Sequence, residues 1–576
     1  MKKFILFLAI LLMIYPVKAL DVDTSNEDLN ILVIEINPTL KTITNGNYSY
    51  NNDHPRVSDL LQGIDAPKIA INEMIEDIED SSYGYIKVKT KWEYLDEFPR
   101  YKKAIKVNGV EGYSLTEKDY LEAIKYNGDG NYNKDYFFNL INSDLFKVPE
   151  AYSFDYEYLI KKFDLINRRN KGEFDQVWLI TIDPANTYET LMVGKNAYWI
   201  NGTPIEKDCN NFVLANVSIS RRDANYHAFG HGIEGIMRKA FGVDKNDYTK
   251  DLYNISTIEE FNKLSLWEKF ALNSYNNKSS FITGVGNVHF PFNGEKDYDY
   301  TNTNKVNSNW EEWLNYPNIN GKTKTYNNEA WKTYDFNNKI LSSSTENKAD
   351  DRLHMRFMTS LFPHFKGRTE DGYSHNWWTY IRSLDFVTKI SSETKIIEVK
   401  EREQANIPYE LTYNSGKVEK LNTMYKSDNT IIGDDSIIDI VDDKIVGLKE
   451  GNTTLKISVD GNSIEYTVNV LKNEVYSETV IDENKDKDKN KDKDNNIIDS
   501  NTIILGVIVV LVIIIIILII VSKKKKNVDN YSDNNYDNSY DNNYDNNYDN
   551  NNNNYDDGYN DDYDDNYDDN DDNNNY

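Results

Sequence analysis

The amino-acid sequence predicts an α/β domain with a largely parallel sheet, followed by a β-sandwich domain. The first observation is a set of short apolar runs of strand length: 31–36, 176–182 and 212–219. The second is a set of segments between these runs whose apolar residues recur with helical spacing: 66–78 and 156–168. The third is an alternation of apolar and polar residues beyond residue 394. Long crossovers between strands favour parallel pairing, because antiparallel neighbours need only a tight turn.

Residues 20–390 form the predicted main domain. The run 31–36 reads ILVIEI and suits a buried strand, whereas 85–92 is rich in residues that favour strands. The segment 66–78 is a predicted helix whose apolar residues recur at helical spacing: Ile69, Ile71, Met74, Ile75 and Ile78. From about 250 to 390 the pattern is more helical and loop-rich, which predicts a cap packed on the same core.

Residues 394–471 read as β-structure throughout. Apolar residues alternate with polar ones on both sides of a turn at Asp460-Gly461: Leu455, Ile457, Val459, Ile464, Tyr466, Val468 and Val470. The string 444–454, KIVGLKEGNTT, resembles the closing part of a bacterial Ig-like domain of group 2. That resemblance implies a β-sandwich of the kind that serves as a stalk or adhesive unit on bacterial surfaces, and it brings no catalytic residues.

Both ends of the chain carry targeting patterns. Lys2 and Lys3 precede an apolar run and a small-residue exit at Ala19, which predicts a secretory signal peptide over residues 1–19. Residues 503–521 are uniformly apolar and long enough to cross a bilayer as one helix, and the lysines at 523–526 mark the cytoplasmic side. We therefore expect a single-pass cell-membrane protein whose ectodomain is extracellular.

Two low-complexity stretches flank the predicted membrane span. Residues 472–502 are dominated by Lys, Asp and Asn, which predicts a charged linker. Residues 522–576 repeat Asn, Asp and Tyr and have almost no aliphatic residues. Because such a segment cannot bury a core, we expect a disordered cytoplasmic tail.

Charge and cysteine content exclude two kinds of partner or site. The net charge is −29, and 16 Asp of the segment 527–576 account for more than half of it. This acidity argues against nucleic acid as a partner, because phosphate binding needs clustered Lys and Arg. Cys209 is the only cysteine of the chain, so neither an intrachain disulfide nor a cysteine-based zinc site can form.

One predicted helix combines the residue types of a metal site. After the run 212–219, Asp223 is a predicted N-cap. His227, His231 and Glu234 follow at i, i+4 and i+7, so their side chains share one face of the helix. Each interior glycine costs a helix about 1 kcal/mol relative to Ala. Three glycines within six residues therefore predict that something approaches this backbone closely: Gly230, Gly232 and Gly235.

Two imidazoles one turn apart are the geometry of a zinc site, and the stretch resembles the zincin metallopeptidase helix, His-Glu-x-x-His. The resemblance implies that His227 and His231 bind a metal ion, with zinc as the expected cofactor. Ala228 stands where that family has its general-base Glu, which puts peptidase activity in doubt. Glu234 would complete the metal face or act as a displaced catalytic base, and His289 is a third candidate ligand. The alternative is a solvated helix face without metal.

Two functions remain open from the sequence. The first is a metal-dependent hydrolase carried on an Ig-like stalk. The second is a non-enzymatic surface adhesin that binds an extracellular glycan or protein. Tryptophans that would line a glycan cleft, unless they belong to the core, are Trp310, Trp313, Trp377 and Trp378.

Three short strings, at 176–178, 230–231 and 286–291, also resemble an uncharacterised group of secreted microbial proteins. This resemblance extends over about 175–380. It implies no activity, so the choice between hydrolase and adhesin depends on how the histidines are arranged.

Overall fold

The computed structural model describes residues 20–43, 54–61, 63–107, 110–114, 116–124, 154–182, 187–243, 253–334, 350–424 and 430–473. All of these belong to one compact unit, Met1–Glu478. The predicted signal peptide, membrane span and tail lie outside the described residues, as does nearly all of the predicted linker: 1–19, 503–521, 522–576 and 472–502.

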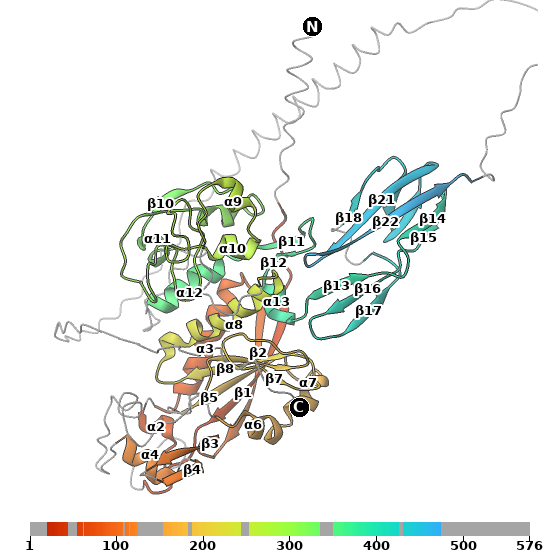
Figure 1. Cartoon of the computed structure of the whole chain (residues 1–576). Coiled ribbons are helices and arrows are strands. Elements are labelled where there is room, and N and C mark those ends of the chain that lie inside the picture. Colours follow the sequence, from red (N-terminus) through yellow and green to blue (C-terminus); the bar gives the residue numbers. More distant parts are fainter. Residues whose placement is uncertain are drawn as a thin grey trace, which may run out of the picture. The chain divides into compact units, whose positions relative to one another are not determined.

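A six-stranded sheet organises the main domain, with the strand order β2-β1-β5-β8-β6-β7 (Figure 1). Its strands are β1 (Glu27–Ile36), β2 (Ile86–Leu95), β5 (Gln176–Thr181), β6 (Thr190–Gly194), β7 (Ile205–Glu206) and β8 (Phe212–Ser218). β1 pairs in parallel with both β2 and β5, and β5 pairs in parallel with β8. β6 runs antiparallel to β8, with Thr190 opposite Ala215. The first residue of β6 therefore lies near the edge of the sheet at which β8 ends.

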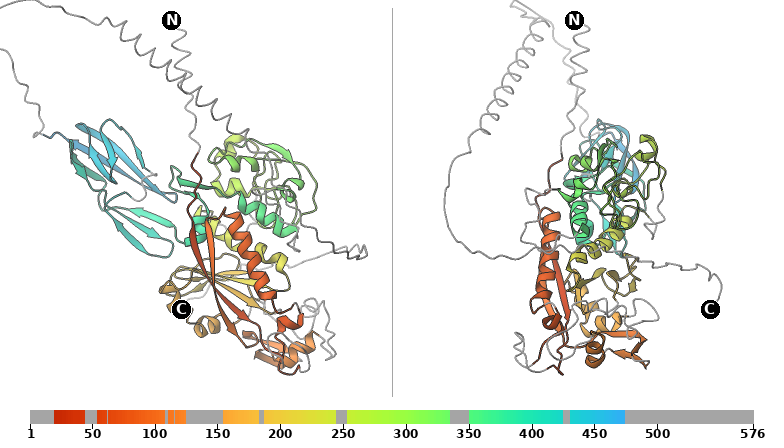
Figure 2. Two further views of the ribbon diagram at one scale, coloured as in Figure 1. Left: turned by 180° about the vertical axis from the view of Figure 1, so that it is seen from behind. Right: turned by 90° about the vertical axis from the view of Figure 1, so that its left-hand side faces the viewer.

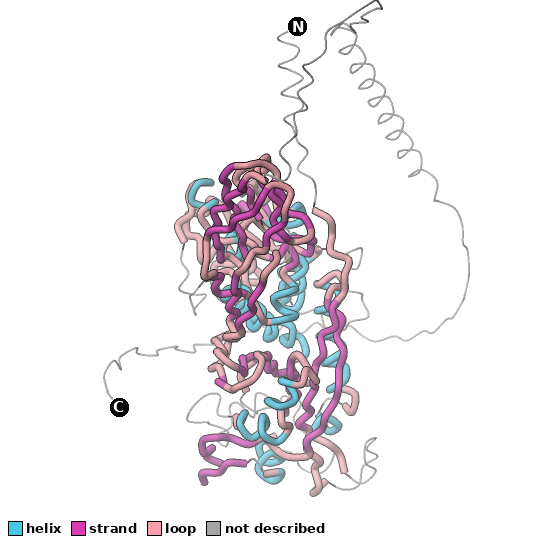
Figure 3. Tube along the Cα trace, turned by 90° about the vertical axis from the view of Figure 1, so that its right-hand side faces the viewer, coloured by secondary structure: helices cyan, strands magenta, loops and turns pink. Residues whose placement is uncertain are grey.

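Helices cover both faces of this sheet (Figure 2). Alternate residues of β1 enter two different cores, because successive strand side chains point to opposite faces. Ile31 and Val33 join the core that includes α3 (Ala66–Ser81) and α8 (Asn225–Ala240). Leu32 and Ile34 join the core that includes α6 (Tyr156–Lys162) and α7 (Leu165–Asn170). Figure 3 shows the long strands in magenta with helices, in cyan, alongside.

The cap shares the core of α3 and α8. It contains α9 (Ile258–Asn262), α10 (Leu266–Ala271), β9 (Val306–Ser308), η2 (Trp310–Asn315), β10 (Lys324–Tyr326), α11 (Glu329–Lys332), α12 (Asp350–Ser360), β11 (His364–Arg368), β12 (Ser374–Asn376) and α13 (Trp378–Ser383). A buried ion-pair network joins α12 to α3. Asp77 accepts hydrogen bonds from Arg352 Nε at 2.9 Å and from Arg356 Nη1 at 2.5 Å. The cap is thus fastened to the sheet layer through charged as well as apolar contacts.

The strands that follow share a third core. They are β13 (Val387–Ser391), β14 (Ile396–Lys400), β15 (Gln404–Ala405), β16 (Tyr409–Tyr413), β17 (Val418–Leu421), β18 (Thr430–Ile432), β19 (Ile438–Val441), β20 (Lys444–Gly447), β21 (Gly451–Val459) and β22 (Asn462–Leu471). β21 and β22 form an antiparallel hairpin around Asp460, where the sequence predicts a turn. The Asp460 carboxylate also accepts hydrogen bonds from Arg368 and from the Tyr380 hydroxyl, both at 3.0 Å. The remaining described elements are α2 (Val57–Leu61), β3 (Arg100–Val107), β4 (Val110–Ser114), α4 (Glu117–Ala123) and η1 (Arg222–Ala224).

The predicted fold class requires a correction, because the central sheet is mixed: four of its strand pairings are parallel, but β6 runs antiparallel to β8. A parallel connection needs a crossover of about a dozen residues or more. Only residues 182–189 separate β5 from β6, so the chain reverses direction between them. Several of the smaller sheets are antiparallel as well.

The membrane prediction is also corrected. Within the described ranges, no helix is long and apolar enough to cross a membrane. A membrane-spanning helix needs about 20 consecutive apolar residues. The longest described helices, α3 and α8, have 16 residues each and include charged side chains. The described residues thus give no support to the predicted single-pass localisation, and the predicted span, 503–521, lies outside them.

Candidate metal centre

The end of β8 fixes the start of α8. Asn225, which is 3% exposed, accepts a hydrogen bond from the Ser218 backbone N–H at 2.8 Å and donates one to the Ser218 carbonyl at 2.9 Å. The predicted N-cap, Asp223, lies instead inside the short helix η1, and Ala224 occupies the N-cap position without a side-chain cap. The amide of Asn225 thus ties the first residue of α8 to the last residue of β8.

The three glycines of α8 lie where other segments come close, as the sequence predicts. A Cβ on Gly232 would lie 3.2 Å from Thr190 side-chain atoms, and a Cβ on Gly235 would lie 2.6 Å from Ile200 Cα. A Cβ on Gly230 would meet the end of the Met355 side chain. The glycines therefore allow the start of β6 and the loop that follows β6 to lie directly against the helix.

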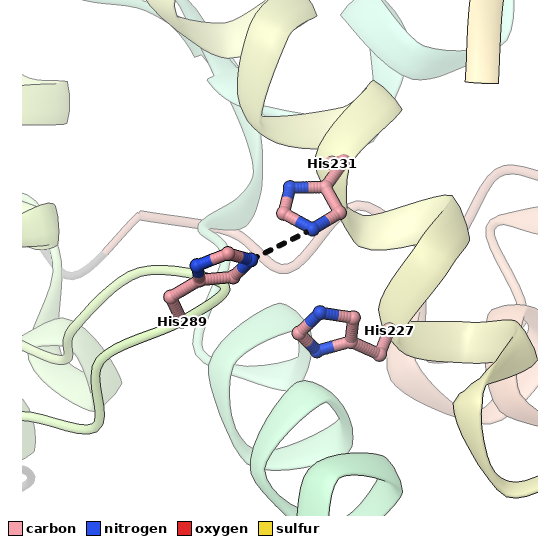
Figure 4. Close-up of side chains that lie close together, drawn as sticks. All are labelled: His227, His231 and His289. Atoms are coloured by element: carbon pink, nitrogen blue, oxygen red, sulfur yellow. Dashed lines mark hydrogen bonds between the residues drawn. The ribbon is translucent and has the colours of Figure 1, made fainter. Parts of the chain in front are cut away.

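His227, His231 and His289 form a buried cluster, called here the three-histidine centre (Figure 4). One ligand atom from each residue lies within 4.8 Å of the other two. His231 Nε2 and His289 Nε2 are 3.1 Å apart. The exposed fractions are 4% for His227 and 9% for the other two. The cluster could hold a metal ion.

A tight loop of the cap carries His289 to α8. Gly286 has φ +109°, and a Cβ there would lie 2.4 Å from the Phe290 carbonyl oxygen. The Asn287 backbone N–H donates to that carbonyl at 3.0 Å, and the Asn287 side chain accepts from the Phe290 backbone N–H at 2.9 Å. His289 therefore lies at the tip of a rigid turn whose conformation depends on glycine at position 286.

The second nitrogen of His289 faces a carboxylate. His289 Nδ1 lies 3.3 Å from Asp297 Oδ1. Histidines that bind metals commonly donate the other ring N–H to a carboxylate or carbonyl, which fixes the tautomer that leaves the remaining nitrogen free for the ion. In this arrangement Nε2 of His289 is the nitrogen that points toward His231.

His227 supplies the sharpest test of whether a metal fits. Both of its ring nitrogens are buried, and neither has a hydrogen-bond partner among the described residues. Leaving a buried polar atom unpaired costs about 1–3 kcal/mol. Two imidazole nitrogens bound to one tetrahedral zinc ion would be about 3.3 Å apart, given Zn–N bonds of about 2.0–2.1 Å. The observed 3.1 Å between His231 and His289 is close to that separation.

Burial favours the neutral form of two of these imidazoles, those of His227 and His231. It lowers the pKa of His227 and of His231 well below the usual value, and the neighbouring histidines lower both pKa values further. A neutral imidazole has a lone pair available for a metal, whereas an imidazolium has none. His354 of α12 is fully buried nearby, and burial lowers its pKa to about 3.

The structure places Glu234 away from the three-histidine centre. Its carboxylate is buried, lies 4.0 Å from the Arg238 guanidinium and lines a small cavity with Trp267 and Asn287. Among the described residues, the group whose ligand atoms lie within 4.8 Å of one another contains three histidines and no Glu234. Glu234 shares the helix face of the two histidines but lies about two turns from His227 and about one from His231, and the third member of the cluster, His289, comes from the cap instead.

Two residues at the centre were not singled out from the sequence. Glu189 Oε2 lies 3.5 Å from His231 Nε2, and 46% of the Glu189 side chain is exposed. Partial loss of solvation beside the protein raises the pKa of Glu189. The Tyr298 hydroxyl lies 3.2 Å from His289 Nε2, and 47% of that residue is exposed. Glu189 directly precedes the apolar run of β6, which is the one sequence signal that marks it.

The tryptophans considered for a glycan cleft are buried. The exposed fractions are 7% for Trp310, 2% for Trp313 and 0% for Trp377 and Trp378. These side chains belong to the core shared by the cap and α8. They are therefore unavailable as an exposed stacking surface.

No protein-family model matches this chain, and no curated protein matches it.

Proposed function

We propose that the three-histidine centre binds a zinc ion and that the protein is a zinc-dependent hydrolase. The observation that carries the proposal is His227, a buried imidazole with two unpaired nitrogens beside two further histidine nitrogens. A zinc ion would satisfy one of these nitrogens and would occupy the space between the three rings. Three imidazoles are also a common ligand set for catalytic zinc.

An open coordination position favours catalysis over a purely structural role. Structural zinc sites have four protein ligands, whereas catalytic sites have three and keep one position for water or substrate. Here three histidines lie within 4.8 Å of one another, and two half-exposed side chains, Glu189 and Tyr298, border them. When bound, zinc would supply Lewis acidity that lowers the pKa of water and polarises a carbonyl oxygen.

Tyr298 is placed to assist at the exposed side of the centre. Its backbone has φ +54°, and its N–H donates to the His289 carbonyl at 3.1 Å, so the residue is held against the third ligand. A non-glycine residue in the left-handed region is uncommon and is maintained by its surroundings. The phenol O–H would donate to a substrate oxygen that gains negative charge in the transition state.

The test is hydrolysis of 4-nitrophenyl acetate by protein that carries one equivalent of zinc. We expect the wild-type protein to hydrolyse this ester faster than the His227→Ala variant, because the variant lacks a ligand. His364→Ala is the matched control, since His364 stacks on Tyr83 with ring centroids 3.9 Å apart and is no part of the centre. Equal rates for the wild-type protein and His227→Ala, with zinc bound to the wild type, would reject a hydrolase at this centre.

A further inference from the structure

The glycines of α8 bring a carboxylate to the three-histidine centre. Gly232 lies against Thr190, the residue after Glu189, and Gly235 lies against Ile200, the residue before Asn201. Any larger residue at position 235 would meet the Ile200 backbone, which cannot move as a side chain can. Because Gly232 and Gly235 have no side chains, the two segments that carry Glu189 and Asn201 can pack directly against the helix.

The direction of β6 sets the side of the sheet on which Glu189 lies. Thr190 begins β6 opposite Ala215 of β8, and the Asn216 N–H donates to the Glu189 carbonyl at 2.8 Å. Since β8 leads into α8, the same edge carries His231. A parallel β6 would have put Glu189 at the opposite edge, far from the histidines.

Asn201 holds the carboxylate in place. Its side-chain Nδ2 donates to Glu189 Oε2 at 2.6 Å, and that same oxygen is the one 3.5 Å from His231 Nε2. The Asn201 backbone has φ +135°, a conformation that non-glycine residues rarely adopt. Such strain persists only where neighbouring contacts impose it, and here the contact of Ile200 with Gly235 is next in the chain.

Glu189 borders the centre without joining its ligand set. It is not among the residues whose ligand atoms all lie within 4.8 Å of one another, although one of its oxygens is near His231. No described residue donates a hydrogen bond to its other oxygen, Oε1. One oxygen is therefore anchored by Asn201, while the other is available to a molecule at the open position.

We propose that Glu189 is the catalytic base of this centre, positioned by Asn201, and that it replaces in space the carboxylate missing at Ala228. The inference rests on the proposed zinc-dependent hydrolase. As a water oxygen bonds to the carbonyl carbon of the scissile bond, the proton that the water loses passes to Glu189. Glu189 then returns that proton to the leaving group as the bond to the carbonyl carbon breaks, so the carboxylate is regenerated.

A binding experiment tests this placement without relying on catalysis. Cobalt(II) replaces zinc and reports its coordination by visible absorption, and azide serves as the probe for the open position. We expect Glu189→Gln to bind cobalt within about threefold of the wild-type affinity. We also expect it to bind azide about five- to tenfold more tightly, because a neighbouring negative charge no longer repels the anion.

Two further variants test whether Asn201 positions the carboxylate and whether the effect depends on where the charge lies. Asn201→Ala frees the carboxylate and should show part of the gain in azide affinity. Glu206→Gln is the control. Glu206 belongs to β7 and pairs with Gly194 at the far end of β6, where its side chain accepts from the Asn196 N–H at 3.0 Å. Removal of this negative charge should leave azide affinity unchanged.

Three other outcomes would overturn the inference. A loss of cobalt affinity of tenfold or more in Glu189→Gln, with no azide response in the wild type, would make Glu189 a ligand and overturn the inference. Equal azide affinity in the wild type and Glu189→Gln would also overturn it, because the carboxylate would not face the open position. Failure of the wild-type protein to bind cobalt at all would reject the metal centre itself, and the inference with it.

Discussion

Glu189 Oε2 lies 3.5 Å from Nε2 of His231, although the two residues come from different elements of the chain. His231 belongs to α8, and Glu189 precedes β6. Their proximity depends on one antiparallel strand and on glycines of α8 that let β6 begin against the helix. A carboxylate from the segment before β6 thus lies beside His231, whereas the helix has Ala228 at the place of the Glu in the zincin pattern.

His227→Leu should stabilise the metal-free protein while abolishing zinc binding. The buried nitrogens of His227 have no partner among the described residues, and a similar-sized apolar side chain removes that cost of about 1–3 kcal/mol. Thermal unfolding in the presence of a chelator measures this directly. Zinc at about 100 times its Kd should stabilise the wild-type protein by about 2.7 kcal/mol and leave the variant unchanged. A lower melting temperature for the metal-free variant would contradict the account of His227.

Asp297→Asn should weaken zinc binding by about tenfold or more. The carboxylate faces His289 Nδ1 at 3.3 Å, and partners of this kind typically contribute 10–100-fold to metal affinity. Competition with a chromogenic chelator measures the change. Glu295→Gln is the control, because it also removes one charge from this loop and its side chain pairs with Asn304 instead. Equal losses in both variants would point to general electrostatics rather than to orientation of His289.

Gly235→Ala should destabilise the protein, whereas Gly230→Ala should cost less. Alanine improves helix propensity by about 1 kcal/mol at either position. At Gly235 the new methyl group meets the Ile200 backbone at 2.6 Å, and overpacking of this kind costs about 1–3 kcal/mol. At Gly230 it meets the end of the flexible Met355 side chain. Urea denaturation of both variants compares them, and a greater loss in Gly230→Ala would contradict the packing seen here.

Asp77→Ala should destabilise the main domain by about 3–5 kcal/mol, because it leaves two buried guanidinium groups without their shared carboxylate. Asp77 is 2% exposed and pairs with Arg352 and Arg356. Glu76→Ala, on the exposed side of the same helix, is the control and should change stability little. Equal effects of the two substitutions on the free energy of unfolding would show that the Asp77 ion pairs do not stabilise the contact between α3 and α12.

Asp351→Asn should stabilise the protein at pH 7 and have little effect near pH 4. Burial and the nearby Asp223 raise the pKa of Asp351 to about 6. Because the folded carboxyl holds its proton more tightly than the unfolded one, the charged form destabilises the fold as pH rises from about 4 to about 6. The amide removes that penalty and can still accept the Arg352 N–H, which Asp351 Oδ1 accepts at 2.9 Å. A benefit of equal size at both pH values would show that the charge is not responsible.

The sequence predicted which histidines come together better than it predicted the residues around them. His227 and His231 are neighbours through helical periodicity alone, and the structure brings His289 to them from the cap. Glu234 shares their helix face but contacts Arg238 instead, because periodicity fixes direction and not the partner that packs opposite. The glycine pattern predicted a close approach, and Thr190 and Ile200 make it.

Glu189 could not be predicted, because its position depends on the pairing of strands. The short run after Glu189 was not predicted to be a strand, and nothing in it indicates that β6 pairs antiparallel with β8. The Asn201 contact depends in turn on a backbone conformation that no local pattern signals. Tertiary contacts, rather than local propensity, therefore decide which carboxylate reaches the histidines.

X-ray absorption at the zinc edge tests most directly whether the three histidines bind zinc. It is measured on the 576-residue protein after loading with one equivalent of zinc and dialysis. We expect retention of about one zinc ion per chain, with three imidazole nitrogens at about 2.0–2.1 Å and one oxygen. His231→Ala should lose the ion under the same dialysis. Loss of zinc from the wild-type protein, or a retained ion without imidazole ligands, would contradict the three-histidine centre.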